Sequence, residues 1–535
     1  MGIFNKVEKV KIPQNVFKDL TYSNKFDMQL GLLYPVEVEE IVPGDLFYAG
    51  HGAMVRSQPM VTPVMHNFNY NIRYFFVPNR IIWENFESFI ADQEKGKKAV
   101  GLESPHVHPY LFSKDARLNM LHDMIGVSPL DGATGFGNLK TSMYFDSDIP
   151  INALPFRAYA MIWNEYFKDE NTMDDFEFPL TDGADDTDYE LLRVSWKKDY
   201  FTSALPFAQR GDEVEMIGNV FLRPEAKGNQ ATKYQELTGT GFYAAYADNP
   251  SGAYLAMDKS RTDDNVHMVK TGGSEDYGKA NIDPNDTLGV ELSFAAIRRA
   301  NALQKFLERS ALGGNRYAEL LLAHFGVRSS DQSLQRPQYL GGGVAPINIS
   351  PVEQTSESGT TPQGTLAGKG VGIGSMYMSK PVMFTEHGWL LGIAYIRPDA
   401  DYCQGLRRQL VKRDRFDYYW PSFQNIGEQE ILNREIFASS HPSDNNGTFG
   451  YQSRYAEYKW HGNEIHGAFR KQLRSWVAPR EFSSLPTLSK EFIECSLDIS
   501  NNMAVSPDQF PPFMVEALNV VNARRPMYYF NRGGL

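Results

Sequence analysis

Residues His66–Val77 restrict the possible folds of this chain more than any other segment. Aromatic and aliphatic residues occupy every second position, and asparagines and an arginine fill most positions between them. Successive side chains of a strand point to opposite faces, so the alternation predicts a strand with one face on a core and the other wet or paired with a polar surface. The expected core face consists of Phe68, Tyr70, Ile72, Tyr74 and Phe76.

Further strands are predicted along the chain. Pro35–Val42 and Phe47–Val55 flank a Pro-Gly-Asp turn, and Phe384–Ile396 is apolar on both faces, as in a fully buried strand. Leu191–Phe207 also has strand-like character. Many short strands separated by turn-rich loops favour an all-β sandwich or barrel with helices in its loops.

Two helices are predicted within Ser293–Gly343, followed by a glycine-rich stretch. Four apolar residues at three- and four-residue spacing share one helical face, and Gly313-Gly314 ends the first helix. These four residues are Ile297, Ala300, Leu303 and Leu307. The segment contains no nucleophile–base pair and no metal-ligand spacing, which indicates packing and assembly rather than catalysis. Pro155–Lys168 is predicted as a further, amphipathic helix.

The remaining segments give the domain organisation. Residues 1–25 are predicted as an extended arm that orders against a partner or the inside of an assembly, with a frayed terminus as an equally open interpretation, and residues 26–211 with 290–535 as the core. Residues 212–289 are dense in Gly, Asn, Asp, Thr and Lys, which predicts a surface insertion with some β-structure. Val344–Tyr377 is predicted as a Gly/Ser/Thr/Pro-rich connection and Asn519–Leu535 as a tail.

Composition excludes several classes of protein. Apolar residues make up 42% of the chain and aromatic residues 13%, which is ample for a packed core. The formal charge of −12 argues against a chain that condenses nucleic acid unaided, because phosphate contacts need clustered Lys and Arg.

Cysteine content and hydropathy bear on the compartment. Cys403 and Cys495 are the two cysteines, which favours a reducing environment. The first residues, MGIFNKVEKVK, lack the apolar core of a signal peptide, and the run Gly388–Ile396 is too short to span a bilayer. We therefore expect no membrane insertion, and assembly in a cytoplasm.

Three groups of residues resemble catalytic or metal sites, but each lacks a feature that such a site requires. Gly368-Lys369-Gly370 lacks the spacing and the Ser or Thr of a phosphate loop. His106, His108 and His122 lack the ligand spacing of a zinc site. The pairs Asp174-Asp175 and Asp185-Asp186 are expected to be solvated loop charges, since glycosidase carboxylates need a defined separation across a cleft. We expect no enzymatic activity, no cofactor and no metal.

Basic clusters are the remaining candidates for a binding site. The run between residues 407 and 415 precedes four aromatic residues, so it offers cations for phosphates and rings for unpaired bases. An intersubunit salt-bridge surface is an equally open interpretation. The candidate DNA-facing residues are Arg407, Arg408, Lys412, Arg413 and Arg415, together with Lys6, Lys9 and Lys11 of the arm. Arg470, Lys471 and Arg474 form a weaker second candidate.

Several segments together resemble one family. They are LQKFLERSALGGNRYAELLLAHFGV, LQRPQYLGGG, YFTSALPFAQRG, TEHGWLLGIAYIRPDADYCQGL, YWPSFQNIGEQEILNREIF, FGYQSRYAEYKW and LPTLSKEFIE. Together, and in their order along the chain, they resemble the major capsid protein of small single-stranded DNA phages, the gokushovirus branch of the Microviridae. The resemblance covers most of the chain and is weakest at residues 212–289.

This resemblance implies a single eight-stranded jelly-roll barrel with long loop insertions that carry several helices. It implies a structural virion protein that assembles as sixty copies into a T=1 icosahedral shell around circular single-stranded DNA, bound without sequence specificity. It also implies as partners a scaffolding protein, a small basic DNA-binding protein, a DNA-pilot protein and a host receptor. Residues 212–289 would build a threefold protrusion.

Two other classes compete with this interpretation. A jelly-roll carbohydrate-binding protein or glycoside hydrolase needs carboxylates or aromatic platforms converging on one cleft, which the sequence does not show. A sequence-specific DNA-binding protein conflicts with the net charge.

Overall fold

The computed structural model describes residues 12–94, 97–98, 101–107, 116–127, 150–209, 219–221, 255–258, 267–270, 276–279, 289–291, 294–314, 316–359, 361–507 and 510–529. The chain divides into two compact units. The first comprises Met1–Ala208 and Leu312–Leu535, and the second is Gln209–Ala311.

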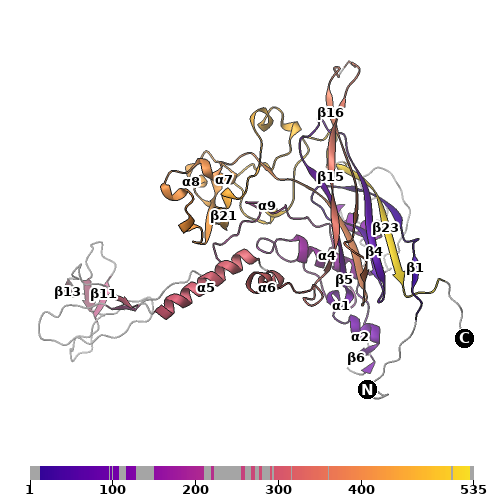
Figure 1. Ribbon diagram of the computed structural model, residues 1–535, viewed down its shortest axis with the longest axis horizontal. Coiled ribbons are helices and arrows are strands. Elements are labelled where there is room, and N and C mark those ends of the chain that lie inside the picture. Colours follow the sequence, from indigo (N-terminus) through magenta and orange to yellow (C-terminus); the bar gives the residue numbers. More distant parts are fainter. Residues whose placement is uncertain are drawn as a thin grey trace. The chain divides into compact units, whose positions relative to one another are not determined.

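A curled antiparallel sheet of ten strands forms the centre of the first unit (Figure 1). Eight strands follow one another in the order β1-β23-β4-β16-β15-β5-β18-β3, while β2 pairs with β23 and β17 with β4. The strands are β1 Asn15–Phe17, β2 Tyr22–Met28, β3 Tyr34–Ile41, β4 Leu46–Ser57, β5 Phe68–Pro78, β15 Gln338–Glu353, β16 Leu366–Tyr377, β17 Val382–Met383, β18 Gly388–Pro398 and β23 Phe513–Arg525. The predicted mainly β, jelly-roll class with helices in long loops is confirmed in this form.

Side chains, rather than a ladder, connect the two ends of this sheet. Among the described residues, β2 pairs only with β23, and β3 pairs only with β18. A register shift leaves Val36 of β3 outside the β18 ladder, and its carbonyl accepts hydrogen bonds from Asn519 Nδ2 at 2.8 Å and Asn24 Nδ2 at 3.3 Å. The Glu40 carbonyl accepts a third, from Arg525 Nη2 at 3.2 Å. We call these contacts the side-chain seam.

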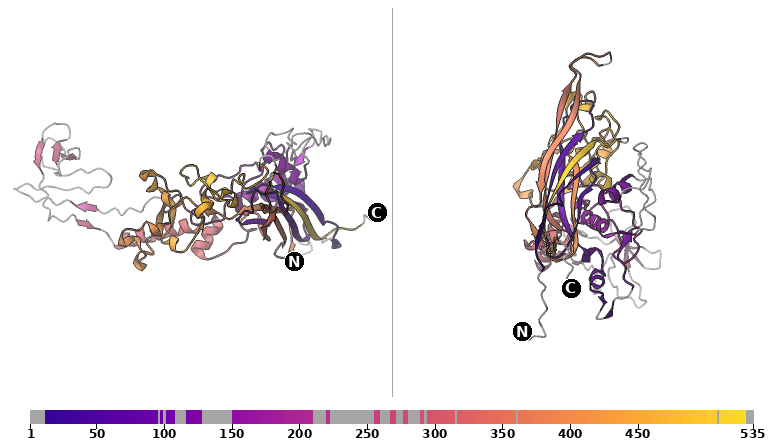
Figure 2. Two further views of the ribbon diagram at one scale, coloured as in Figure 1. Left: turned by 90° about the horizontal axis from the view of Figure 1, so that it is seen from above. Right: turned by 90° about the vertical axis from the view of Figure 1, so that its right-hand side faces the viewer.

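Helices cover the second face of β5 and β18 (Figure 2, right). The helices and short strands of this layer are α1 Asn79–Ile82, α2 Phe86–Ala91, β6 Gln93–Glu94, β7 Lys97–Lys98, β8 His106–Val107, α3 Ala116–Ile125, β9 Ile151–Asn152, α4 Leu154–Ile162 and η2 Trp163–Phe167. As a result the polar face expected for His66–Val77 is not wet. Asn71 is buried, and Phe75 and Val77 pack beneath this layer.

The helix predicted at Pro155–Lys168 is present, but its amphipathic character is wrong. Every residue of α4 except the half-buried Met161 is buried, including a charged one. Arg157 Nε pairs with Asp185 Oδ2 at 2.8 Å, with neither side chain exposed. The expectation that Asp185 is a solvated loop charge is therefore also wrong, because it neutralises a buried guanidinium.

The remaining predictions for the first unit have mixed outcomes. The strands at Pro35–Val42, Phe47–Val55 and Phe384–Ile396 are confirmed as β3, β4 and β18, although β18 begins only at Gly388. Leu191–Phe207 forms no strand and makes isolated bridges instead. The connection predicted at Val344–Tyr377 is the β15–β16 hairpin, and the first part of the predicted tail, residues 519–525, belongs to the long strand β23.

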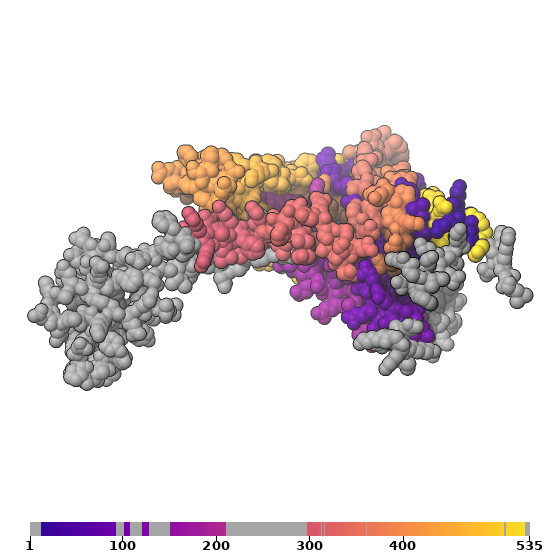
Figure 3. All heavy atoms as spheres, turned by 60° about the horizontal axis from the view of Figure 1, so that its bottom comes forward, coloured from indigo at the N-terminus to yellow at the C-terminus, as the bar shows by residue number. Residues whose placement is uncertain are grey.

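The lobe of residues 401–504 carries short elements between β18 and β23. They are β19 Asp401–Tyr402, η3 Arg408–Leu410, η4 Arg415–Asp417, η5 Pro421–Phe423, β20 Glu428–Leu432, α7 Asn433–Ile436, α8 Pro442–Asn445, β21 Thr448–Ser453, η6 Ala456–Tyr458, β22 Asn463–Glu464, η7 Gly467–Arg470, η8 Arg474–Trp476 and α9 Lys490–Ile493. Its first part is orange in Figure 3.

The second unit contains the β-structure predicted for residues 212–289. Strand β10 Asn219–Phe221 pairs antiparallel with β14 Gly289–Glu291, and β11 Leu255–Asp258, β12 His267–Lys270 and β13 Asp276–Lys279 form a separate sheet. The two helices predicted within Ser293–Gly343 are confirmed as α5 Phe294–Gly313, most of which belongs to the second unit, and α6 Tyr317–Phe325, which belongs to the first. No helix in the described part of the chain is long and apolar enough to cross a bilayer.

Candidate assembly surface and nucleic-acid site

Two aspartates fix the backbone of the predicted basic run. Asp417 accepts hydrogen bonds from the backbone amides of Arg413 and Asp414, both at 2.9 Å, and these bonds lower the pKa of its carboxyl. Asp414 in turn accepts from the Arg415 amide at 2.6 Å. The run therefore has a defined fold between η3 and η4.

Three of the five predicted cations in this run are engaged within the subunit. Arg407 Nε pairs with Glu464 at 2.9 Å, and Arg408 Nη1 pairs with Glu435 at 3.0 Å. Lys412 Nζ lies 4.1 Å from the centre of the Tyr458 ring and is almost fully buried. These contacts stabilise the lobe, so the three residues have little freedom to hold phosphates.

The other two cations are exposed, and one of them lies beside an aromatic ring. The Arg415 guanidinium lies 4.6 Å from the centre of the Phe416 ring. Arg413 makes no ion pair with any described residue. Four aromatic residues nearby are about half exposed, namely Phe416, Tyr418, Tyr419 and Trp420. This arrangement suits single-stranded nucleic acid, because guanidinium groups can hold phosphates and the rings can stack on bases of any sequence.

The second basic cluster, Arg470, Lys471 and Arg474, also contains both engaged and exposed side chains. Arg470 donates to the Cys403 carbonyl at 2.7 Å, and Arg474 pairs with Glu481 at 3.1 Å. Lys471 is exposed. The arm residues Lys6, Lys9 and Lys11 lie outside the described residues.

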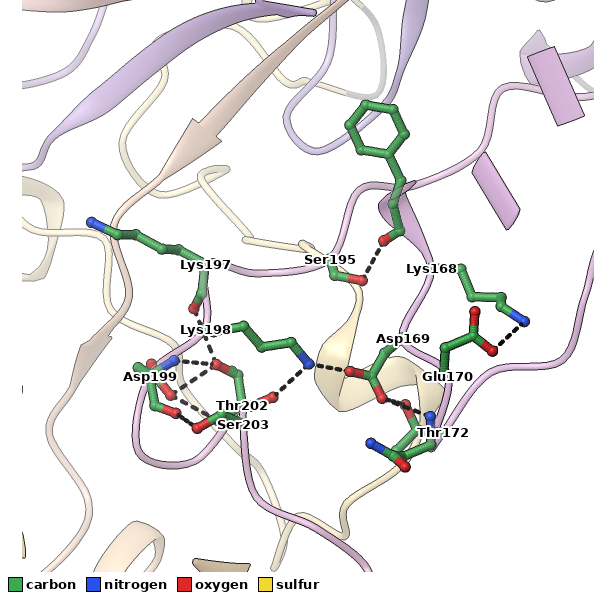
Figure 4. Close-up of polar contacts among 12 residues, drawn as sticks. Lys168, Asp169, Glu170, Thr172, Ser195, Lys197, Lys198, Asp199, Thr202 and Ser203 are labelled. Atoms are coloured by element: carbon green, nitrogen blue, oxygen red, sulfur yellow. Dashed lines mark hydrogen bonds and ion pairs between the residues drawn. The ribbon is translucent and has the colours of Figure 1, made fainter. Parts of the chain in front are cut away.

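A polar network holds the irregular segment 195–203 in place (Figure 4). Ser195 Oγ donates to the Phe167 carbonyl at 2.7 Å, and Lys198 bridges Asp169 and the Thr202 carbonyl. Asp199 accepts from the Thr202 amide at 2.7 Å and, from the lobe, from the Tyr402 hydroxyl at 2.8 Å. The network thus ties η2 to the start of the lobe.

Sequence reasoning missed Arg480, which organises the lobe. This residue is buried, with its guanidinium 4.2 Å from the centre of the Phe492 ring and 4.7 Å from that of Trp196. Its Nη1 donates to the Tyr402 hydroxyl at 3.0 Å. Nothing in the local sequence distinguishes Arg480 from the exposed arginines, because its partners are distant in the chain.

Large apolar side chains are exposed on several parts of the surface. On the outer side of the central sheet they are Val344, Ile373, Tyr377, Met514 and Leu518. After α5 they are Tyr317, Leu322, Phe325 and Val327, and in the lobe Leu406, Leu410, Ile426 and Tyr458 join the four aromatic residues. Near the C-terminus they are Met527, Tyr528 and Tyr529. Contiguous exposed apolar surface marks interaction sites, so the subunit offers several.

The rejected catalytic and metal sites have simple structural roles where they are described. Gly368-Lys369-Gly370 lies within the extended strand β16. His122 packs on Phe156, and His108 lies outside the described residues. No group of three metal-ligating side chains occurs among the residues the structure describes. Cys403 and Cys495 are unpaired, and burial raises the pKa of Cys495 to about 12.

Comparison with known proteins gives matches over nearly the whole chain. Residues 6–535 match the family described as Capsid protein (F protein). The chain is 34% identical over 532 residues to Capsid protein VP1 of Bdellovibrio phage phiMH2K, covering 95% of this chain and 93% of that protein. It is 30% identical over 599 residues to Capsid protein VP1 of Chlamydia phage 1, covering 99% and 97%. Capsid protein VP1 of Spiroplasma virus 4 is 27% identical over 548 residues.

Proposed function

The chain belongs to the phage capsid F protein family and is a structural component of the virion, and we propose that sixty copies close into a T=1 icosahedral shell around circular single-stranded DNA. The family membership replaces the carbohydrate-binding alternative. The proposal treats the chain as a purely structural protein without catalytic activity.

The observation that carries the shell proposal is the spread of exposed apolar side chains over several surfaces of one subunit. A monomer or a single dimer would leave most of them in water, whereas a closed shell gives each subunit several neighbours. Each contact can then be modest, because closure makes every additional contact effectively intramolecular.

The shell proposal is tested by expressing the full chain and separating the product by size-exclusion chromatography with electron microscopy. Uniform closed particles tens of nanometres across are the expected result. A folded monomer at all concentrations and salt conditions, with no closed particles, would contradict it.

We place the DNA contacts at Arg413 and Arg415 on the inner side of the shell, with the lysines of the arm. The basic charge of these positions in a chain of net charge −12 supports this assignment. An impermeant amine reagent applied to sealed particles should leave Lys6, Lys9 and Lys11 unlabelled. Labelling of all three in intact particles would exclude an inner arm.

The remaining genome charge requires other partners, because the subunit is acidic on average. We assign this role to a small basic DNA-binding protein, with a scaffolding protein and a DNA-pilot protein acting during assembly. Co-expression tests this: particles formed from the capsid chain alone should contain less DNA than particles formed with the basic protein.

Residues 212–289 are proposed to build an outward protrusion at the threefold axis that contacts a host receptor. The antiparallel pairing of β10 with β14 supports this, because the segment leaves and re-enters the chain at one place. Two deletions test the proposal: one joins Gly211 to Val290, and the other links Phe221 to Gly289 by a short turn that keeps the β10–β14 ladder. Shells without protrusions and without host attachment are expected. Loss of soluble subunit in both deletions would instead make the segment part of the core.

A further inference from the structure

The outer sides of β23, β4 and β16 form one continuous surface, which we call the outer sheet face. The ladders align three rows of side chains across these strands. The rows are Leu518–Gly52–Ser375, Glu516–Met54–Ile373 and Met514–Arg56–Val371. The alternate residues of β23 point into the core, where Val515, Ala517 and Asn519 are buried.

This face is apolar and is not covered by the described parts of its own chain. The Ile373 side chain is 69% exposed, and Leu518 and Met514 are exposed to 48% and 43%. Gly52 leaves a shallow trough beside Leu518, since a Cβ placed there would meet no atom closer than 3.8 Å. Charges are sparse on the three rows, which contain Glu516 and Arg56.

The extent of the face matches the requirement for a specific contact between two proteins. Strands spaced ~4.8 Å apart and same-face residues ~6.7 Å apart give roughly 300 Å² for the three rows on β23, β4 and β16. The area rises to roughly 600 Å² when the flanking strands β2 and β15 and the next row, Val520–Gly50–Tyr377, are added. Two such faces in contact would bury about 1,200 Å², the lower end of the standard range for stable interfaces. Sheets pack face to face in this way at ~10 Å separation.

The two charges on the rows are arranged for reciprocal pairing. Glu516 lies opposite Met54, and Arg56 lies opposite Met514, so the two charged residues are diagonal neighbours on adjacent strands. Both are exposed, and neither forms an ion pair with a described residue; Arg56 Nη2 contacts the Met54 sulfur at 3.2 Å. Lys25 of β2 lies opposite Glu516, also without an ion pair to a described residue.

We propose that the outer sheet face is a two-fold contact in which a second copy of this chain packs sheet against sheet, with Glu516 of each subunit against Arg56 of the other. The inference rests on the proposed shell, because it names one of the contacts by which copies associate. A two-fold contact uses the same patch on both subunits, so an apolar centre with one acidic and one basic position satisfies it twice. The pairs fix the orientation of the two sheets, and burial of Ile373, Leu518 and Met54 drives the association.

Complementary charge reversal tests the two-fold geometry. Glu516→Arg alone and Arg56→Glu alone place like charges together in both halves of the contact, and each variant should dimerise at least ~10-fold more weakly than the wild type. An equimolar mixture of the two variants restores opposite charges in both halves. Native mass spectrometry of the mixture should therefore show heterodimers at close to wild-type affinity.

The mixture separates the contact from effects within one subunit. Glu516→Arg also meets Lys25 in its own chain, but mixing cannot relieve that repulsion. Glu357→Arg and Lys459→Glu, exposed reversals away from this face, are the matched controls and should dimerise like the wild type.

Four results would overturn the inference. Single variants that dimerise like the wild type exclude the face from the contact. A mixture no better than the single variants excludes two-fold symmetry. Normal dimers with weakened binding of a thymidine oligonucleotide would assign the face to nucleic acid. Closed particles from either single variant would refute the two-fold contact while leaving the shell proposal intact.

Discussion

His51 Nδ1 donates to Asn519 Oδ1 over 2.6 Å in the centre of the sheet, where both side chains are fully buried. The Asn519 amide nitrogen donates to the Val36 carbonyl, and His51 Nε2 accepts from the Tyr70 hydroxyl at 2.7 Å. This assignment requires a neutral imidazole. Burial lowers the pKa of His51 to about 4, which is consistent with it. These three hydrogen bonds link strands β4, β5 and β23 to the bulge of β3.

Asn519→Ala should destabilise the subunit by about 1–3 kcal/mol, because it leaves the buried His51 Nδ1–H without a partner. It also removes the shorter of the two hydrogen bonds to the Val36 carbonyl, which keeps the one from Asn24. The denaturant midpoint of the unassembled subunit measures the effect. Asn522→Ala, on the exposed side of the same strand, is the control and should lie within ~0.5 kcal/mol of the wild type. Equal effects at both positions would contradict the role of the seam.

Glu37 should make the subunit less stable as pH rises from 6.5 to 8. Burial, with the negative charge of Glu39 as a second cause, raises the pKa of Glu37 to about 8 in the folded state. Between its unfolded pKa near 4.5 and this value, the folded state holds a proton that the unfolded state lacks, so stability falls with increasing pH. His51 contributes only below its unfolded pKa of 6.5, where its stabilisation is lost as pH falls toward 4.

Glu37→Gln should remove this decline. Between pH 6.5 and 8, its free energy of unfolding should therefore rise by about 2 kcal/mol relative to that of the wild type. The glutamine carbonyl can still accept the hydrogen bond that the Tyr74 hydroxyl donates at 3.2 Å. Urea midpoints at several pH values give the comparison. Parallel profiles for the two proteins would show that Glu37 is ionised in the fold.

Arg157→Met should cost about 3–5 kcal/mol, because it leaves the Asp185 carboxylate buried without its cation. The double variant Arg157→Met/Asp185→Asn removes both charges and should recover part of the loss. Thermal unfolding of the single and double variants forms the measurement. If the loss of stability in the double variant equals or exceeds the sum of the losses in the two single variants, the charges do not act as a pair.

Arg413→Ala/Arg415→Ala and Trp420→Ala should each weaken binding of a thymidine oligonucleotide, the tryptophan variant by ~5- to 100-fold. The arginine variant should also reduce the dependence of affinity on salt, since fewer counterions are released. Fluorescence anisotropy at 50–200 mM salt would measure both. Arg407→Ala is the comparison variant, because its guanidinium is already engaged by Glu464. The same loss of affinity in all three variants would refute the assignment.

Gly52→Trp should leave the subunit folded but prevent packing of the outer sheet face. The position has room for a side chain, and tryptophan is well accepted in strands. Gly50→Trp is the contrasting variant, because a Cβ at Gly50 would lie 2.2 Å from the Tyr377 ring and should disturb the fold itself. Circular dichroism and analytical ultracentrifugation separate the two effects. A Gly52→Trp subunit that still dimerises would exclude this face from the contact.

The spacing of apolar residues was sufficient to predict a strand or helix where that spacing lies within one element. The alternation at His66–Val77 and the apolar run at Phe384–Ile396 predict strands at the centre of the sheet, and both are present. The helices α5 and α6 follow from spacing and from the glycines between them. The jelly-roll topology was accessible only through resemblance, since strand order depends on distant pairings.

Glycine content concealed the β15–β16 hairpin. Four glycines alternate in LAGKGVGIGSMY, a composition that suggests a flexible connection. They are needed because neighbouring groups approach closely: a Cβ on Gly368 would lie 2.5 Å from the Thr62 carbonyl oxygen, and one on Gly374 would lie 2.5 Å from the Ala345 Cβ. Among the basic residues, the sequence could not separate Arg413 and Arg415 from Arg407 and Arg408, because the carboxylate partners are 27 or more positions away.

The seam has a consequence for which substitutions this protein tolerates. A ladder is built from main-chain groups that every residue except proline supplies, so its positions discriminate between substitutions by volume and shape. The bulge at Val36 instead depends on amide nitrogens carried by Asn24 and Asn519. In a randomised library selected for folded subunit, positions 24 and 519 should therefore accept few residue types, and Ser23 and Asn522, on the same strands, should accept many. Substitution at positions 24 and 519 is therefore limited by whether the new side chain carries a hydrogen-bond donor. Substitution at other positions of the sheet is limited by the volume of the side chain.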